Sequence, residues 1–174
     1  TCALPILSFK TLADRSALVT QESKTPNPLA TGIARNKLYV EPSKLILSLD
    51  YSPTSTTLVT VDLQNFQTTR VDLPFPISTE TKPKLKTNSC YHKGYLFQLQ
   101  YNEQQLRLSR TKVDDQTAVR QWSANKDSIP FRNGPIWRQT GNRRPVAIET
   151  SKKFLKRLQA SDAGLTVYTM PRSE

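Results

Sequence analysis

The stretches KLILSLDYSPTSTTLVTVDL (residues 44–63) and GYLFQLQYNEQQLRLSRTKV (residues 94–113) are the most informative part of the sequence about the fold, because they repeat one pattern 50 residues apart. Each is twenty residues long, and their alignment places apolar or aromatic residues on one another. We interpret this as an internal repeat. The alternative is two ordinary meanders that look alike because all meanders share a pattern. The matched pairs are Leu45 and Tyr95, Leu47 and Phe97, Leu49 and Leu99, Tyr51 and Tyr101, Leu58 and Leu108, Leu63 and Val113, and, further on, Arg70 and Arg120.

The first copy begins with an alternating segment. Leu45, Leu47 and Leu49 fall on one face of a strand, with Lys44, Ser48 and Asp50 on the other and Ile46 as the exception. Alternation with period two is typical of a half-buried strand. Short turn segments follow in both copies, at 52–56, 64–67, 102–105 and 114–117. We therefore predict that residues 44–73 and 94–122 form two superimposable antiparallel meanders.

A unit of 45–50 residues with four short strands is typical of a β-propeller blade. The sequence thus predicts a single domain (1–174) that is mainly β, with antiparallel meanders resembling propeller blades at about 38–74 and 89–124. The prolines and lysines of residues 74–89 predict a loop between the two units. Two further strands are expected within residues 4–22, and a proline-containing connection at 23–32.

The C-terminal part, residues 128–174, has a different pattern. Residues 128–145 have turn signals and no regular period. Residues 148–164 predict one amphipathic helix, capped by Thr150 or Ser151 and ended by Gly164. We expect Phe154, Leu155 and Leu158 on its buried side, and a closing strand in LTVYTM (165–170).

The charge of the chain is strongly positive and uneven. The 25 Lys and Arg residues exceed the 14 Asp and Glu residues, giving a net charge of +11 that favours polyanions, acidic proteins or anionic membranes. The densest cluster lies in residues 128–160, where eight cations accompany Glu149 alone, with Phe131, Trp137 and Phe154 among them. A solvated helix face is the alternative to polyanion binding. The eight candidate polyanion-binding residues are Arg132, Arg138, Arg143, Arg144, Lys152, Lys153, Lys156 and Arg157.

The sequence lacks the motifs of several common classes of enzyme. Phosphate-binding glycine loops and the G-x-S-x-G nucleophile motif are missing from the sequence. His92 is the single histidine, and we interpret it as a strand-end residue rather than a catalytic base. Asp114 and Asp115 fit a turn better than an acid–base or metal site. We expect no catalytic residues, no metal site and no cofactor.

The two cysteines, Cys2 and Cys90, do not form a disulfide framework or a zinc ligand set. The sequence starts with Thr1-Cys2 rather than Met, which suggests a chain whose leader has been removed. Cys2 is therefore a candidate for lipidation, as in bacterial lipoproteins. An ordinary cysteine, free or paired with Cys90, remains the alternative.

The four-strand units, followed by FRNGPIW (131–137) and IETSKKFLKRLQASDAGLTVY (148–168), resemble uncharacterised secreted or lipid-anchored β-propeller-like proteins of Bacteroidota. The resemblance covers residues 38–168, and the KKFLKRL…D.G helix-to-strand step is its most specific part. It implies an exported scaffold with no catalytic residues to transfer. About 3.5 units of 50 residues are too few to close a propeller, so the resemblance implies a piece of a longer protein or an open arrangement.

Two classes of function follow. The first is a non-enzymatic, extracytoplasmic β-scaffold that binds an unknown protein, glycan or cell-envelope polymer, with membrane attachment only through a lipid at Cys2. The second is a basic module that binds nucleic acid or other polyanions, non-specifically and in a salt-sensitive way. An enzyme is the less favoured third class.

Overall fold

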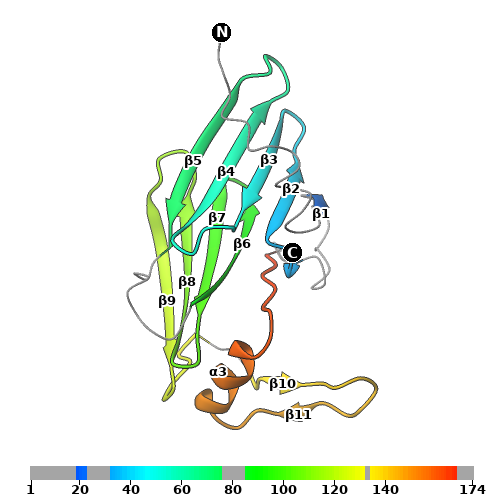
Figure 1. Cartoon of the computed structure of the whole chain (residues 1–174), viewed down its shortest axis with the longest axis vertical. Coiled ribbons are helices and arrows are strands. Elements are labelled where there is room, and N and C mark those ends of the chain that lie inside the picture. The colour runs from blue at the N-terminus through cyan, green and yellow to red at the C-terminus, as the bar shows by residue number, and fades with distance from the viewer. Residues whose placement is uncertain (1–18, 23–31, 76–84, 132–133, 168–174) are drawn as a thin grey trace, which may run out of the picture.

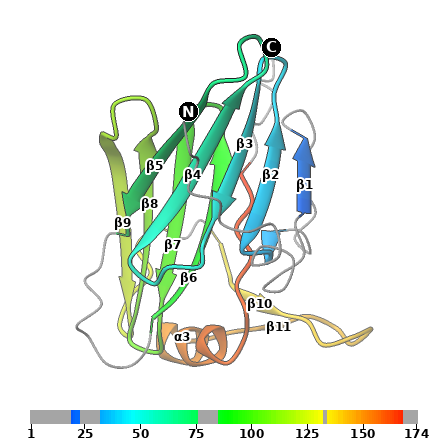
Figure 2. The same ribbon diagram turned by 45° about the horizontal axis from the view of Figure 1, so that its top comes forward.

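A computed structural model describes residues 19–22, 32–75, 85–131 and 134–167 of the chain. The strands expected within residues 4–18, nearly all of the expected 23–32 connection, Cys2 and Arg132 lie outside these ranges. Most of the described chain forms two β-sheets that face one another, with a helix at one end and a projecting hairpin (Figures 1 and 2).

Sheet 1 has five strands in the order in which they occur along the chain. β1 pairs with β2 in parallel, and every other neighbouring pair is antiparallel. The strands are β1 (Val19–Glu22), β2 (Asn36–Val40), β3 (Lys44–Leu49), β4 (Ser55–Asp62) and β5 (Thr68–Pro74).

Sheet 2 is a four-stranded antiparallel meander. It begins at Lys86, so the last residues of the predicted 74–89 loop are a strand instead. A two-residue turn that the sequence analysis missed joins the first two strands. Its residues Lys93 (φ 48°) and Gly94 (φ 82°) both have positive φ, as a type I′ hairpin turn requires. The strands are β6 (Lys86–His92), β7 (Tyr95–Tyr101), β8 (Gln105–Lys112) and β9 (Ala118–Asn125).

The prediction of two antiparallel meanders followed by a C-terminal helix is confirmed, and the two meanders share one turn geometry. Phe66 and Gln116, 50 positions apart, both take the left-handed conformation, with φ of 58° and 56°. One residue before each, Asn65 and Asp115 accept a hydrogen bond from the N–H two positions ahead, at 2.9 and 3.0 Å. Neither sheet closes into a barrel, and the described residues form no closed propeller.

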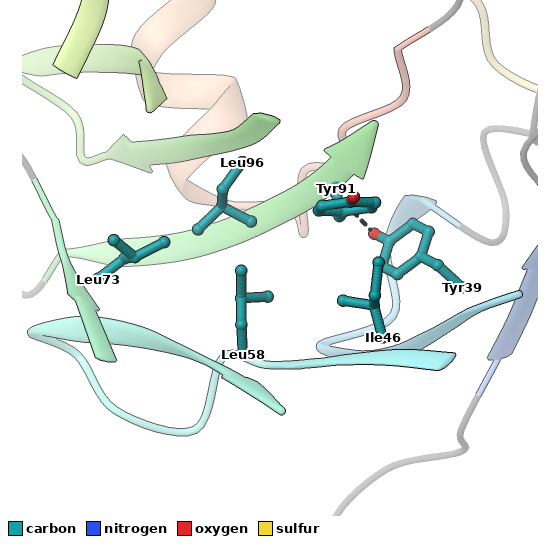
Figure 3. Packing of buried hydrophobic residues seen from close by; sticks show 6 residues of the cluster. All are labelled: Tyr39, Ile46, Leu58, Leu73, Tyr91 and Leu96. Carbon is teal, nitrogen blue, oxygen red and sulfur yellow. Dashed lines mark hydrogen bonds between the residues drawn. The ribbon is translucent and has the colours of Figure 1, made fainter. Parts of the chain in front are cut away.

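The first hydrophobic cluster lies between the two sheets (Figure 3). Sheet 1 contributes side chains from all four of its antiparallel strands, and sheet 2 contributes Tyr91 and Leu96. The Tyr39 hydroxyl accepts a hydrogen bond from the Tyr91 N–H at 3.0 Å, so the contact between sheets is polar as well as apolar. The buried members are Tyr39, Ile46, Leu58, Leu73, Tyr91 and Leu96.

The face of β3 that packs against sheet 2 is the opposite of the one predicted. Ile46 and Ser48 of β3 are buried, as is Asp50 just after it, while Leu45 and Leu47 are half-buried on the outer side of sheet 1. Leu49, the third leucine of the predicted face, is buried at the end of the strand. Alternation correctly predicted a strand with two faces. It could not show which face would be covered, because the covering residues come from β6, about 50 positions away.

The second hydrophobic cluster lies on the outer face of sheet 2, where helix α3 (Ser151–Gln159) packs. Leu155 is fully buried there, whereas Phe154 and Leu158, which we also expected to be buried, are half-buried. The remaining buried members come from β7, β8, β9 and the residue that follows the Asn125 turn: Leu99, Tyr101, Leu106, Ala124 and Ile129.

The helix begins as predicted and ends early. Thr150 is its N-cap, and the Thr150 hydroxyl oxygen accepts a hydrogen bond from the Lys153 N–H at 3.2 Å. Its C-cap is Ala160, so Gly164 is not the stop signal. Residues 165–167 form no strand, contrary to expectation; there the Leu165 N–H bonds to the Gly32 carbonyl at 3.2 Å. The rest of the predicted closing strand lies outside the described residues.

Candidate polyanion-binding surface

A short β-hairpin occupies part of the region that the sequence analysis predicted to be irregular. Its strands are β10 (Trp137–Arg138) and β11 (Val146–Ala147), paired in antiparallel fashion. The Ile148 N–H donates to the Ile136 carbonyl at 2.7 Å and so extends the pairing by one bond. Trp137 is 59% exposed, which is unusual for so large an apolar side chain.

The hairpin and α3 are anchored in the same place. Ile136 at the base of the hairpin, and Phe154 and Leu158 of the helix, all pack against the second hydrophobic cluster on sheet 2. The apolar side of α3 therefore packs on sheet 2 and leaves its polar side exposed. Ile136 packs on the same cluster and anchors the start of the hairpin beside the helix. Figure 1 shows the hairpin extending from this anchor, away from the body of the two sheets.

Seven of the eight predicted cations lie in the described residues, and all seven are exposed. They form two groups on these adjoining elements: three on the hairpin and four on the polar side of α3. Arg143 and Arg144 lie in the loop that joins β10 to β11. The hairpin extends away from α3 (Figure 2). We call the seven the cationic surface: Arg138, Arg143, Arg144, Lys152, Lys153, Lys156 and Arg157.

Few acidic groups neutralise the cationic surface. Within the described part of the chain, its one ion pair joins Lys153 Nζ to Glu149 Oε2 at 2.7 Å. This contact lowers the pKa of Glu149. Lys156 and Arg157 lie in the last turn of α3, where cations are favoured by the negative end of the helix dipole.

A shallow cavity on the hairpin combines an aromatic ring with a cation. Its volume is about 570 Å³, and its described lining is Trp137, Gln139, Arg144 and Pro145. The sequence indicates Trp137 and Arg144 but not Gln139 or Pro145, because no strand period predicts the hairpin that brings them together.

A second group of polar residues, which the sequence analysis also missed, is buried between the sheets. Lys37 of β2 is fully buried, and its Nζ donates to the Asn88 side-chain oxygen at 3.0 Å and to the Ser89 carbonyl of β6. Asp50 is 1% exposed, and its Oδ1 accepts from the Thr56 hydroxyl at 2.7 Å. Gln98 of β7 joins the sheets through its bonds to Thr56 Oγ1 at 3.3 Å and to the Leu73 carbonyl at 3.0 Å. We call this group the inter-sheet polar cluster.

Burial shifts the ionisable members of this cluster toward their neutral forms. Desolvation lowers the pKa of Lys37, and the nearby Asp50 carboxylate opposes the shift. Desolvation likewise raises the pKa of Asp50, with Lys37, Thr56 and Ser89 opposing it. The buried Cys90 thiol, a free cysteine, also has a pKa raised by desolvation, so it is not an activated nucleophile.

Other candidate chemistry takes the structural role that the sequence predicted. His92 ends β6 and is half-buried. Asp115 stabilises the β8–β9 turn, as expected for Asp in a turn. In the described ranges, no three His, Cys, Asp or Glu side chains gather as a metal site would require. No helix in those ranges has the length and apolar character needed to cross a bilayer.

Comparison of the chain with protein-family models, with curated proteins and with solved structures finds no match.

Proposed function

We propose that this protein is a non-enzymatic binding module whose hairpin and α3 bind polyanions through the cationic surface. The observation that supports this most directly is the exposure of seven cations on two adjoining elements with Glu149 as their one ion-paired neighbour among the described residues. Cations placed this way displace counterions from any polyanion, which makes affinity depend on salt rather than on sequence.

Trp137 favours one subclass, single-stranded nucleic acid. An exposed aromatic ring beside a cation offers a base a stacking surface, and such stacking contributes about 1–3 kcal/mol per base. Heparin and anionic lipid have no base to stack. Trp137→Ala therefore tests whether base stacking contributes to binding. If it does, this variant binds a single-stranded oligonucleotide more weakly than the wild type but binds heparin equally well.

The decisive experiment is a binding titration of heparin, a single-stranded oligonucleotide and anionic vesicles between about 50 and 200 mM salt. The double variant Arg143→Gln/Arg144→Gln should reduce the salt slope by about 1 for each arginine that contacts a phosphate or sulfate. Lys93→Gln/Lys126→Gln removes the same charge from exposed sites outside the cationic surface and should leave the slope nearly unchanged.

Equal losses in the two double variants would mean that net charge alone attracts the polyanion, and the proposed surface would be wrong. Absence of binding at the lowest salt would also reject the proposal. Tight, sequence-selective binding of one nucleic acid at the highest salt would instead identify a dedicated nucleic-acid module.

We also infer that the two meanders are blade-like units related by the 50-residue repeat, which the matching turn conformations of Phe66 and Gln116 support. Ile46 of β3 and its repeat partner Leu96 of β7 both belong to the first hydrophobic cluster, so the two units bury the same face against one another.

An exported, envelope-associated role with lipidation at Cys2 is a separate proposal, which rests on the N-terminal sequence and the resemblance. Metabolic labelling with a fatty acid in a bacterial host that expresses the full coding sequence tests it. Incorporation that Cys2→Ser abolishes is the expected result, and no incorporation would reject the anchor.

A further inference from the structure

The inter-sheet polar cluster places a primary amine against a carboxamide where water is excluded. Lys37 Nζ lies 3.0 Å from Asn88 Oδ1, with Lys37 fully buried and Asn88 2% exposed. Oδ1 is bonded to Cγ, so Nζ is placed beside the carbon that it would attack. The carboxamide is held in place, because Asn88 Nδ2 donates to the Ile33 carbonyl at 3.2 Å and to the Ala34 carbonyl at 3.5 Å.

An acid that can move protons lies in the same cluster. Asp50 is close enough to Lys37 and Ser89 for their charges and hydrogen bonds to act on its carboxyl. Its Oδ2 is buried, and no described atom meets hydrogen-bond geometry with it. A buried carboxyl oxygen without a full hydrogen bond can take up and return a proton.

We propose that Lys37 and Asn88 join spontaneously in an intramolecular isopeptide bond that links β2 to β6, with Asp50 as the proton carrier. The uncharged Lys37 amine attacks Asn88 Cγ, so that a Nζ–Cγ bond forms. The Cγ–Nδ2 bond then breaks, and Nδ2 leaves as ammonia after it takes the proton that Nζ loses. No oxidant, reductant or co-substrate is consumed, and Asp50 returns to its starting state.

The surroundings meet the demands of this reaction. An attacking lysine must be uncharged, and burial lowers the pKa of Lys37, which favours its uncharged form. An amide leaving group must receive a proton, and burial raises the pKa of Asp50, which favours the protonated acid that can donate one. Folding supplies the approach of two groups 51 positions apart in the chain, which replaces a collision in solution by fixed proximity. A cavity of about 80 Å³ bordered by Ile33, Arg35 and Asn88, among others, gives the ammonia an exit.

The test is mass spectrometry of the folded, purified protein. The intact mass should be lower than the sequence mass by one ammonia. Trypsin should release peptide 36–44, uncleaved at Lys37, covalently joined to peptide 87–93. Asp50→Asn keeps the shape of the side chain but removes the transferable proton, so this variant should have the full sequence mass and separate peptides.

A wild-type mass equal to the sequence mass would overturn the proposal whether or not any variant folds. A loss of ammonia confined to an unlinked 87–93 peptide would also overturn it, since that product is a succinimide at Asn88-Ser89. An Asp50→Asn protein that is cross-linked to the same extent as the wild type would remove Asp50 from the reaction.

Discussion

Replacement of Leu155 by alanine tests the docking of α3, on which the cationic surface depends. Leu155 is fully buried against sheet 2. The change removes three carbons, worth about 2.4 kcal/mol at about 0.8 kcal/mol each, and the cavity left behind adds about 24 cal/mol for each Å³ that does not collapse. Because Phe154 and Leu158 are only half-buried, they can move into part of that space. We expect a loss of about 3 kcal/mol in the free energy of unfolding.

The assay is urea unfolding followed by far-ultraviolet circular dichroism, with Lys156→Ala as the matched control. Lys156 is exposed on the same helix, and its replacement should change the free energy of unfolding by less than about 0.5 kcal/mol. Hydrogen exchange adds a spatial readout: protection should fall in α3 and the hairpin more than in β2–β5. A loss below about 1 kcal/mol for Leu155→Ala, or equal losses for both variants, would refute the reasoning that α3 is docked through this side chain.

Three further predictions concern turns, a cap and a titration. Phe66→Asn and Gln116→Asn should each stabilise the protein, by up to about 1 kcal/mol in thermal or urea unfolding, because asparagine tolerates the left-handed conformation better; opposite effects would contradict the equivalence of the two turns. Thr150→Ala should destabilise by about 1 kcal/mol through loss of the N-cap, and no change would mean that the cap is not formed in solution. Burial and, to a lesser degree, Lys93 lower the pKa of His92, so its proton NMR titration should have a midpoint below the ordinary value of about 6.5 and Lys93→Gln should raise it. His92 of the unfolded chain binds its proton at a higher pH than His92 of the folded chain, so the free energy of unfolding should decrease as the pH falls below about 6.5. A midpoint at the ordinary value would contradict the lowered pKa.

Much of the local structure of the protein can be predicted from its sequence. Alternation of apolar residues, and turns that contain Pro, Asn or Asp, depend on neighbours a few positions away, so the two meanders and their 50-residue spacing could be recognised without a structure. The helix was predictable for the same reason, because Thr150 and the spacing of Phe154, Leu155 and Leu158 are local signals. Its end was not, since Gly164 resembles a stop signal but the helix closes at Ala160.

Only the tertiary structure decided which faces are buried and which distant groups meet. The alternation in β3 is equally consistent with burial of Leu47 or of Ser48, and sheet 2 resolves this by placing Tyr91 and Leu96 against the face that holds Ile46. Lys37 and Asn88 are unremarkable in the sequence, because a lysine and an asparagine 51 positions apart give no local signal. Burial between two packed sheets brings them to 3.0 Å and strips them of water, and that desolvation, which no sequence pattern encodes, gives the pair its chemistry.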